Sequence, residues 1–288
     1  MAHTEVDPAH SARDLCEQAA DAARRAAERA GIVVRPLNGI AELDEGSVLI
    51  SRIWDDGDAE VKAPTSMLRA LEHAGNFVAG AFDGIRMVGI SFGFFGRDGA
   101  ELHLHSHITG VDRKLQGRSL GFALKQFQRS WALDRGVDTI LWTADPLVRG
   151  NAHFNLVKLG AAMVDYHENF YGYLQDGLNA GDSDRVVLRW DLASERAVRA
   201  ADGVSGEPVA DGGCVVLRPG GDGGPVTGEA SGDVLLAWLP KNIVRLREED
   251  ERCAGDWRLA LRETVGRALA GEFRAEGITR DGWLVLRR

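Results

Sequence analysis

The chain has 288 residues, 44% of them hydrophobic, and a formal net charge of -9 at pH 7. This length allows one large core or two smaller ones, and the acidic balance argues against a general affinity for nucleic acid, which needs a basic surface. The sequence has no apolar run near the ~20 residues of a membrane span, no signal-peptide pattern and no C-x-x-C spacing among its three cysteines. It therefore predicts a cytoplasmic protein without a membrane partner, a disulfide framework or a zinc site.

The N-terminal part of the chain predicts helices alternating with strands. Ser11 is a suitable N-cap for an alanine-rich helix, which could pack on its own domain or on a second subunit and so allows a homodimer. Asp83-Gly84, between two apolar runs, is a strong signal for a two-residue hairpin. The elements expected here are a helix at 11–29, a strand at 32–37, helices at 40–54 and 66–74, and strands at 76–82 and 85–95.

The run 101–111 predicts a strand with a clear alternation of side chains. We expect Leu102, Leu104, Ser106 and Ile108 on one face, and His103, His105, His107 and Thr109 on the other. Same-face neighbours along a strand are roughly 7 Å apart, so three histidines do not converge on one metal ion without distortion. A histidine titrates near neutral pH and is better suited to proton transfer. At least one of the three is expected to be an ordinary histidine packed in the sheet.

The segment 111–125 predicts a phosphate-binding loop at a helix start. The first turn of a helix has backbone N–H groups without internal partners and a partial positive charge, which together favour an anion. Gly117, Ser119 and Gly121 leave space for close approach. The alternative is an ordinary turn with small residues, since a short glycine signature alone is weak evidence.

An amphipathic helix follows, because Leu120, Leu124, Phe127 and Trp131 recur at helical spacing while Lys125, Arg129 and Arg135 lie off that stripe. A strand at 138–143 and a second helix at about 149–159 come next. Gly160 stands where a helix C-cap favours a positive φ.

Two separated motifs resemble the GCN5-related N-acetyltransferase (GNAT) superfamily. Gln116-x-x-Ser119-x-Gly121 is similar to its Q/R-x-x-G-x-G/A signature, with Ser119 at the usual first glycine, and Asn151 with Lys158-Leu-Gly-Ala161 is similar to its second half. The resemblance implies an α/β (α+β) GNAT fold, with a mixed, mostly antiparallel central sheet flanked by helices, and acyl-CoA as co-substrate. The cofactor-binding residues that it implies are Thr109, Gly110, Val111, Gln116, Gly117, Arg118, Ser119, Leu120, Gly121 and Asn151.

The resemblance also implies positions for the proton-transfer groups. A carboxylate on the strand before the loop often acts as the base in this superfamily, and the register puts His103 there, with His105 and His107 closer to the loop. We expect one of these three to be the base. A backbone N–H at Gly110 or Val111 is expected to polarise the thioester carbonyl.

The usual general acid of the superfamily, a tyrosine four residues before the closing glycine, is replaced here by Leu156. Tyr166 and Tyr171 are nearby substitutes, and Tyr171 is taken as the candidate acid. A thiolate can also leave unassisted near neutral pH.

Further runs resemble one GNAT subfamily with a C-terminal extension, which includes succinyl-CoA:D-amino acid N-succinyltransferase-like proteins. These runs are 141–147, 151–155, 158–161, 169–172 and 183–185, with Trp190. The extension is expected to contain a strand at 235–240, a helix at 249–273 and a closing strand at 282–287. A succinyl group or an amino-acid acceptor needs a cation for its carboxylate. Arg185 and Arg258 are the expected substrate-binding residues and Arg262 is a further candidate, although each could instead form an ordinary salt bridge.

The expected organisation is an N-terminal helix (1–30), an acyl-CoA-binding domain (31–199), a Gly/Pro-rich linker or hairpin excursion (200–231) and an α/β extension (232–288). The expected activity is transfer of an acetyl or succinyl group from acetyl-CoA or succinyl-CoA to a small-molecule amine, such as an amino acid, by direct attack in a ternary complex and without a metal. Two alternatives stay open: a non-catalytic acyl-CoA-binding or regulatory protein, favoured by Leu156, and a metal-dependent hydrolase built on the histidine strand.

Overall fold

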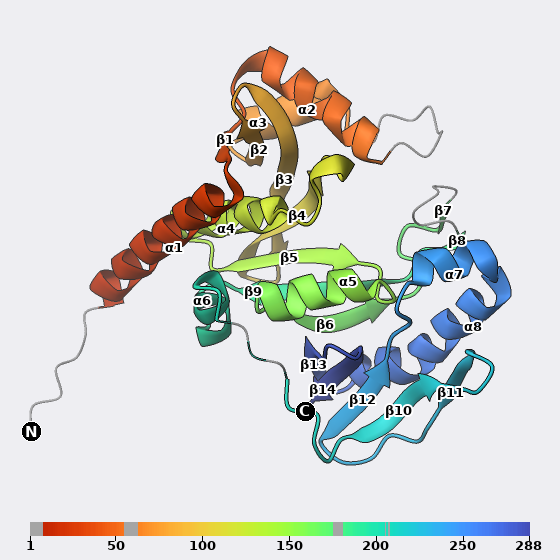
Figure 1. Cartoon of the computed structure of the whole chain (residues 1–288). Helices are drawn as coiled ribbons and strands as arrows, with labels where there is room; N and C mark the ends of the chain where they lie inside the picture. The colour runs from red at the N-terminus through yellow and green to blue at the C-terminus, as the bar shows by residue number, and fades with distance from the viewer. Residues whose placement is uncertain (1–7, 55–62, 175–180, 205, 207) are drawn as a thin grey trace, which may run out of the picture. The chain divides into compact units, whose positions relative to one another are not determined.

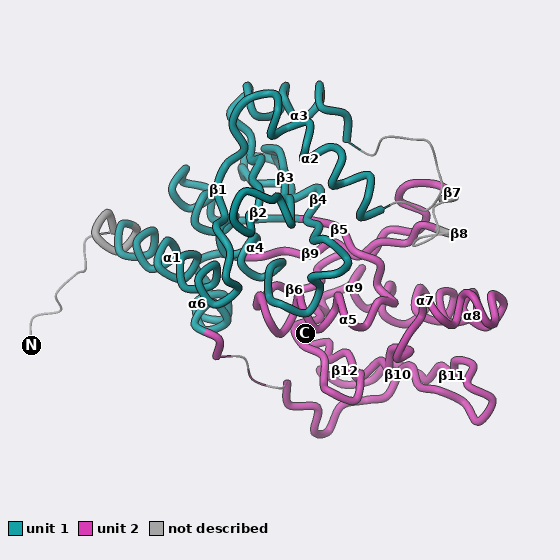
Figure 2. Tube along the Cα trace, turned by 45° about the horizontal axis from the view of Figure 1, so that its top comes forward, with its two compact units in different colours: residues 1–141, 191–202 teal, residues 142–190, 203–288 magenta. Residues whose placement is uncertain are grey.

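The computed structural model describes residues 8–54, 63–174, 181–204, 206 and 208–288 (Figure 1). The chain forms two compact units (Figure 2): Met1–Leu141 with Asp191–Asp202, and Trp142–Trp190 with Gly203–Arg288. The boundaries of these compact units differ from the domain ranges expected from the sequence. The expected domain organisation therefore stays a prediction. None of the described helices combines the length and apolar character that crossing a bilayer requires.

The first unit is built on antiparallel strands in the order β1-β2-β3-β4, with β5 parallel to β4. Alternate side chains of these strands face opposite sides, and helices cover both. On one side, α2 and α3 pack Leu43, Ile50 and Leu68 on Ile90 and Phe92; on the other, Leu120 and Leu124 of α4 pack on Val88. The elements are α1 (Pro8–Ala30), β1 (Val33–Pro36), α2 (Gly39–Ile53), α3 (Thr65–His73), β2 (Phe77–Asp83), β3 (Arg86–Asp98), β4 (Glu101–Val111), α4 (Leu120–Leu133), the first half of β5 (Thr139–Ala144) and α6 (Glu195–Ala201).

The alanine face of α1 lies against α4 of the same unit. Ala19, Ala22 and Ala26 are at most 1% exposed. The helix could have packed on its own domain or on a second subunit, and the structure shows it packed on its own unit.

The second unit contains a further run of strands in the order β9-β6-β13-β14-β12-β10-β11. Its strands are β6 (Ala162–His167), β9 (Arg185–Asp191), β10 (Cys214–Pro219), β11 (Pro225–Thr227), β12 (Val234–Trp238), β13 (Arg274–Ile278) and β14 (Trp283–Arg287), beside a separate pair, β7 (Tyr173–Leu174) and β8 (Gly181–Asp182). Its helices are α5 (Arg149–Ala152), continued by a π-helical segment (His153–Lys158), α7 (Ile243–Glu249), α8 (Glu251–Leu261), and α9 (Arg267–Ala270), which follows a π-helical segment (Arg262–Gly266).

The mixed α/β architecture with a mostly antiparallel sheet flanked by helices is confirmed. The strand predicted at 101–111 has those bounds, and Gly160 has a φ of 75°. The hairpin was placed one residue too early: its turn residues are Gly84 and Ile85, because Asp83 pairs with Arg86.

The C-terminal part differs more from expectation. The single helix expected at 249–273 is divided, because Asp250 ends α7 and its side chain caps α8 by accepting a hydrogen bond from the Cys253 N–H at 2.9 Å. Strand β13 was missed. The Gly/Pro-rich stretch at 200–231 contains the β10–β11 hairpin. β10 also pairs with β12, so this hairpin belongs to the sheet of the second unit.

Candidate functional site

The C-terminal half of β4 has an edge without a strand neighbour in the first unit. β4 pairs with β3 from Glu101 to Val111, but its pairing with β5 is confined to Leu104 with Ile140 and His105 with Leu141. From Ser106 onward, β4 therefore has a described strand partner within its unit on one side only. Backbone groups on the other side can bind a ligand.

The pairing with β3 decides which backbone groups lie on this open edge. The Asp112 N–H donates to the Val88 carbonyl at 2.9 Å. In an antiparallel pair the hydrogen-bonding direction alternates along the strand, so Gly110 also points toward β3, where it pairs with Ile90. Thr109 and Val111 then direct their N–H groups to the open edge. Of the two expected donors to a thioester carbonyl, the structure favours Val111.

Gly110 has a packing role instead. A Cβ built on it would lie 2.5 Å from the ring of Trp54, just after α2. Glycine is therefore needed for the indole to cover this part of β4.

A β-bulge interrupts β4 at His107. Phe92 pairs with Ile108 while Gly93 pairs with Ser106, so His107 has no residue opposite it. Beyond the bulge the alternation is shifted: Ile108 packs with Phe92 in the core under α2 and α3, and the Thr109 hydroxyl is 2.8 Å from that of Ser91 on the opposite face. The prediction that Ile108 shares a face with Ser106, and Thr109 with the histidines, is wrong for this reason.

His105 and His107 lie beside each other on one face, with ring centroids 6.1 Å apart, and Phe94 stacks on His105 at 5.0 Å. Burial, then the charges of His107, His103 and Lys125, lowers the pKa of His105 to about 4, and burial lowers the pKa of His107. Both imidazoles are therefore neutral at pH 7 and able to accept a proton. The low pKa of His105 makes it a weak base, which favours the other two candidates.

The third candidate, His103, lies close to the β3 backbone. A Cβ on Gly96 would be 2.5 Å from its Nε2 atom. The glycine therefore makes room for the imidazole.

The predicted loop between β4 and α4 is anchored at its entry and exposed at its tip. The Asp112 carboxylate accepts from the Lys114 N–H at 3.0 Å and from Arg86 at 2.6 Å, and Arg113 Nε donates to the Ile53 carbonyl at 2.9 Å. The hydrogen bond from the Lys114 N–H is the main reason that the pKa of Asp112 is lowered, so its carboxylate holds the turn at any ordinary pH.

At the tip, Gln116, Gly117, Arg118 and Ser119 are all exposed and lead into the 14-residue helix α4, whose buried Leu120 fixes its start. Gly117 has φ 83° and Ser119 has φ 63°. Both are in the left-handed region, which turns the chain into the helix and is rare for a serine. The expected loop at a helix start is thus present with exposed backbone.

Polar side chains of α4 off the predicted apolar stripe are also buried. Lys125 is 3% exposed and Arg129 is 0% exposed. Arg129 donates to the Leu192 carbonyl at 3.0 and 2.8 Å. The Lys125 Nζ lies 2.9 Å from Ser106 Oγ and 3.0 Å from Gln128 Oε1, so this helix is covered on more than one face.

Lys125 should give stability a pH dependence that a methionine lacks. Burial lowers the pKa of Lys125 to about 7, against roughly 10.4 in an unfolded chain. Between these values the unfolded state binds one more proton, so stability rises with pH and the gain is lost as the pH falls to 7. In urea unfolding at pH 7.0 and 9.5, the rise should be about 3 kcal/mol larger in the wild type than in Lys125→Met.

The exposed Lys114 provides the control. Lys114→Met should keep the wild-type rise. Equal rises in the wild type and in Lys125→Met would show that this amine does not titrate as described.

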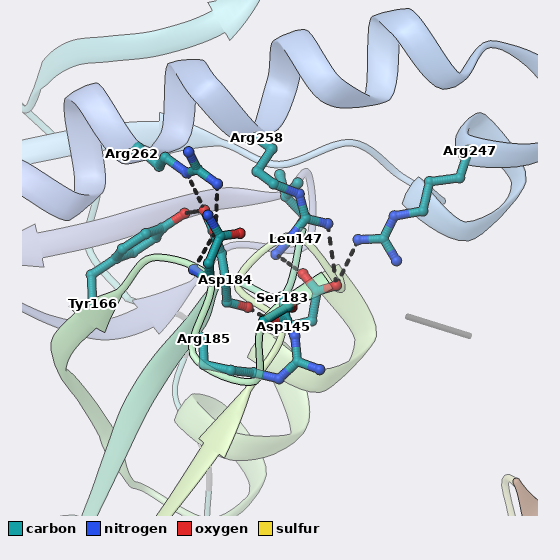
Figure 3. Close-up of polar contacts among 11 residues, drawn as sticks. Asp145, Leu147, Tyr166, Ser183, Asp184, Arg185, Arg247, Arg258 and Arg262 are labelled. Carbon is teal, nitrogen blue, oxygen red and sulfur yellow. Dashed lines mark hydrogen bonds and ion pairs between the residues drawn. The ribbon is translucent and has the colours of Figure 1, made fainter. Parts of the chain in front are cut away.

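In the second unit, a buried ionic network surrounds Asp184 (Figure 3). Its side chain is 0% exposed and accepts from Arg262 at 2.6 and 2.7 Å and from the Tyr166 hydroxyl at 2.6 Å. Burial alone would raise the pKa of Asp184, but the hydrogen bonds from Arg262 and Tyr166 outweigh it and the pKa is lowered. The same environment raises the pKa of Tyr166, chiefly through burial. Tyr166 is therefore a fixed hydrogen-bond donor and unsuited to proton transfer.

Asp145, after β5, forms the other half of this network. Its carboxylate lies 2.6 Å from Arg247 and 3.9 Å from Arg258, and accepts from the Leu147 N–H at 2.9 Å. Figure 3 shows Arg247 and Arg258 directed toward it. Sequence reasoning did not single out Asp145 and Arg247. The arginines of the helix predicted at 249–273 were the available signal that carboxylates lie nearby.

The remaining expected residues of this unit have mixed environments. Arg185 is 7% exposed, donates to the Asp184 carbonyl at 2.9 Å and lies 5.3 Å from the centre of the Tyr171 ring. The Tyr171 hydroxyl is 3.2 Å from that of Thr143, and its side chain is 45% exposed. Asn151 is exposed on α5. Leu156 is 2% exposed and belongs to the core.

The expected residues are thus divided between the units. The histidines and the residues from Thr109 to Gly121 belong to the first unit, whereas Asn151, Tyr171, Arg185 and Arg258 belong to the second. Over the described parts of the chain, no three His, Cys, Asp or Glu side chains are grouped so as to hold a metal ion.

No protein-family model matches the chain, and no curated protein matches it. Similar solved structures include a GNAT-family acetyltransferase from Streptococcus pneumoniae (13% identity, TM-score 0.46, covering 55% of this chain and 98% of that one). Two others are the ribosomal-protein-S18-alanine N-acetyltransferase from Escherichia coli (15%, 0.44, 57% and 97%) and a GNAT-family acetyltransferase from Elizabethkingia anophelis with acetyl-CoA bound (14%, 0.42, 56% and 99%). At these identities and TM-scores no residue's role follows from the likeness.

Proposed function

We propose that this chain is a GNAT-superfamily N-acyltransferase that moves an acetyl or succinyl group from coenzyme A to the amine of a small molecule, such as an amino acid. The observation that carries the proposal is the combination, in one unit, of an open β4 edge with the exposed loop at the start of α4. A pyrophosphate suits exposed N–H groups at a helix start. A pantetheine amide suits an unpaired strand edge, which offers the same hydrogen bonds as another strand.

The reaction then proceeds by direct attack. The thioester carbonyl accepts a hydrogen bond from the Val111 N–H, which stabilises the oxyanion that forms. A histidine of β4 takes one proton of the ammonium, and the nitrogen then bonds to the carbonyl carbon. The carbon–sulfur bond breaks to release the thiolate, and the nitrogen loses its second proton to solvent to give the neutral amide. His107 and His103 are preferred over His105 because of its low pKa.

The thiolate can take its proton from water; Tyr171, which belongs to the second unit, stays the acid that the sequence resemblance implies. Leu156 cannot donate one, and the hydroxyl of Tyr166 is engaged by Asp184. Tyr171 has a partly exposed hydroxyl beside Thr143, which is compatible with exchange of protons with solvent. The reaction can continue without Tyr171, since a thiol is a good leaving group.

Arg258 and Arg185 are proposed to bind a carboxylate of the acyl group or of the acceptor. Both guanidinium groups are buried, at 6% and 7% exposure, and both are oriented by neighbouring acceptors. A guanidinium that neighbouring acceptors already orient loses little conformational entropy when it binds a carboxylate in bidentate fashion.

The test is thiol release from acetyl-CoA and succinyl-CoA, each against a panel of L- and D-amino acids and simple amines, on metal-free protein. Amine-dependent release supports acyl transfer, and a preference for succinyl-CoA with amino acids supports the carboxylate assignment. Coenzyme A binding without release under any condition would contradict catalysis and favour the alternative, a non-catalytic acyl-CoA-binding protein, to which Leu156 points.

A further inference from the structure

The second unit contains a cationic pocket that is lined by none of the residues proposed for the reaction. It is a cavity of about 670 Å³ beside α5, lined by Arg149, Gly150, His153, Lys241, Ile278, Thr279, Arg280 and Asp281. Among these described residues, three side chains carry a permanent positive charge and one a negative charge. The balance is about two positive charges when His153 is neutral.

The β13–β14 turn gives the pocket a defined wall. The Gly282 N–H donates to the Thr279 carbonyl at 3.0 Å, and the Trp238 indole donates to the Asp281 carbonyl at 2.9 Å. The Trp283 N–H donates to Thr279 Oγ1 at 3.1 Å, which leaves the Thr279 hydroxyl able to donate its own hydrogen to a ligand.

Arg149 connects α5 to this turn. Its guanidinium donates to the Arg280 carbonyl at 2.5 Å. It also occupies the space where a Cβ of Gly282 would lie, 2.3 Å from the Arg149 Cζ atom, and Gly282 has φ 95°. Glycine at this position therefore lets a charged guanidinium pack against the backbone of the turn.

Burial and nearby charges both act on the ionisable groups of the pocket. Burial is the main cause of the lowered pKa of Arg149, with Asp281 acting in the opposite direction. Burial, then the charges of Lys158 and Arg280, lowers the pKa of His153. A bound anion would oppose the charge contributions of Lys158 and Arg280 at His153.

We propose that this pocket binds the phosphate monoester group of a small ligand. A phosphate monoester carries about -1.5 to -2 charges at pH 7, which matches the excess positive charge. Guanidinium groups and a hydroxyl donor are suited to its oxygens. The cavity has the volume of a small-molecule site, so it has room for an organic part of the ligand beside the phosphate.

The experiment follows the imidazole of His153 by NMR in the full-length protein while inorganic phosphate is added at constant ionic strength. We expect a saturable shift and a rise in the pKa of His153 by about half a unit or more, since an anion favours the imidazolium. Arg280→Gln and Lys241→Gln should each weaken phosphate binding at least fivefold. Both side chains are exposed, so neither change should unfold the protein.

The matched control is Arg252→Gln, which removes an exposed arginine outside the pocket and should leave binding unchanged. A response to phosphate no larger than the response to chloride, or equal weakening by Arg252→Gln, would overturn the proposal.

Two sources of the phosphate group are distinguished by coenzyme A and dephospho-coenzyme A. If His153 responds to coenzyme A but not to dephospho-coenzyme A, the bound group is the 3′-phosphate of coenzyme A. A response to inorganic phosphate but to neither nucleotide identifies a separate phosphorylated molecule. Since the readout is binding in the second unit, the result does not depend on whether the protein transfers acyl groups.

Discussion

Replacing Asp184 by alanine is expected to lower the free energy of unfolding by about 3 to 5 kcal/mol, because it removes the buried carboxylate of the pair with Arg262 and leaves only the more exposed Glu168, at 3.4 Å. Arg262 donates two hydrogen bonds to Asp184, at 2.6 and 2.7 Å, and its side chain is only 15% exposed. The Tyr166 hydroxyl loses its acceptor as well, and an unpaired buried donor adds its own penalty. Urea unfolding at pH 7 measures the loss.

Two further variants show whether the loss of stability comes from the buried ionic network or from shortening an aspartate in general. Asp21→Ala removes a carboxylate from an exposed pair with Arg24, where both side chains are more than half exposed, and should change stability by about 0.5 kcal/mol or less. The double change Asp184→Leu with Arg262→Met should recover part of the loss, since apolar side chains can replace a buried ion pair. A loss for Asp184→Ala no larger than that for Asp21→Ala would contradict the described network.

Replacing Gly117 by valine is expected to raise the KM for acyl-CoA tenfold or more. Gly117 has φ 83°, and a β-branched residue there costs about 1 to 3 kcal/mol of strain. The loop would relieve this strain by moving its backbone N–H groups away from the pyrophosphate. Each 1.4 kcal/mol of lost binding is about a factor of ten. Steady-state kinetics with varied acyl-CoA should show a raised KM and a kcat near the wild-type value at saturation.

Ser119 offers a matched pair at one position, because it has φ 63°. Ser119→Val should act in the same direction as Gly117→Val, whereas Ser119→Gly removes strain and should leave the KM equal or lower. An unchanged KM in both valine variants would show that acyl-CoA does not bind at this loop.

The alternation of side chains was enough to predict the strand β4 but not the β-bulge within it. The alternation from Glu101 to Val111 gave the strand with correct bounds. The unopposed His107 arises from the register with β3, a pairing that the sequence of one strand does not contain. Faces beyond the bulge were therefore assigned incorrectly.

The helical pattern of α4 also could not predict which of its polar side chains are buried. The spacing of apolar residues in α4 identified one core face, but Lys125 and Arg129 lie off it and are buried all the same. Their partners are Ser106 in β4 and the Leu192 carbonyl before α6. Such contacts depend on tertiary packing, which overrides the helical pattern.

The sequence suggested arginines that could bind a carboxylate, but it did not show which acidic residues of the chain they contact. A need for carboxylate binding suggested Arg185, Arg258 and Arg262, yet Asp184 lies 78 positions from Arg262 in the sequence. A search for cations could not reveal the carboxylates that orient them. The exposed loop before α4 was easier to predict, since its small residues and the helix start are local features of the sequence. Its binding of a phosphate stays a proposal.

The measurement that tests the central claim most directly is hydrogen–deuterium exchange of the protein with and without acetyl-CoA. The account predicts slower exchange in the peptides that span Thr109 to Gly121, because the Val111 N–H and the N–H groups at the start of α4 would bind the ligand. The β10–β11 hairpin should not change. Binding of acetyl-CoA without protection of this segment would contradict the proposed site.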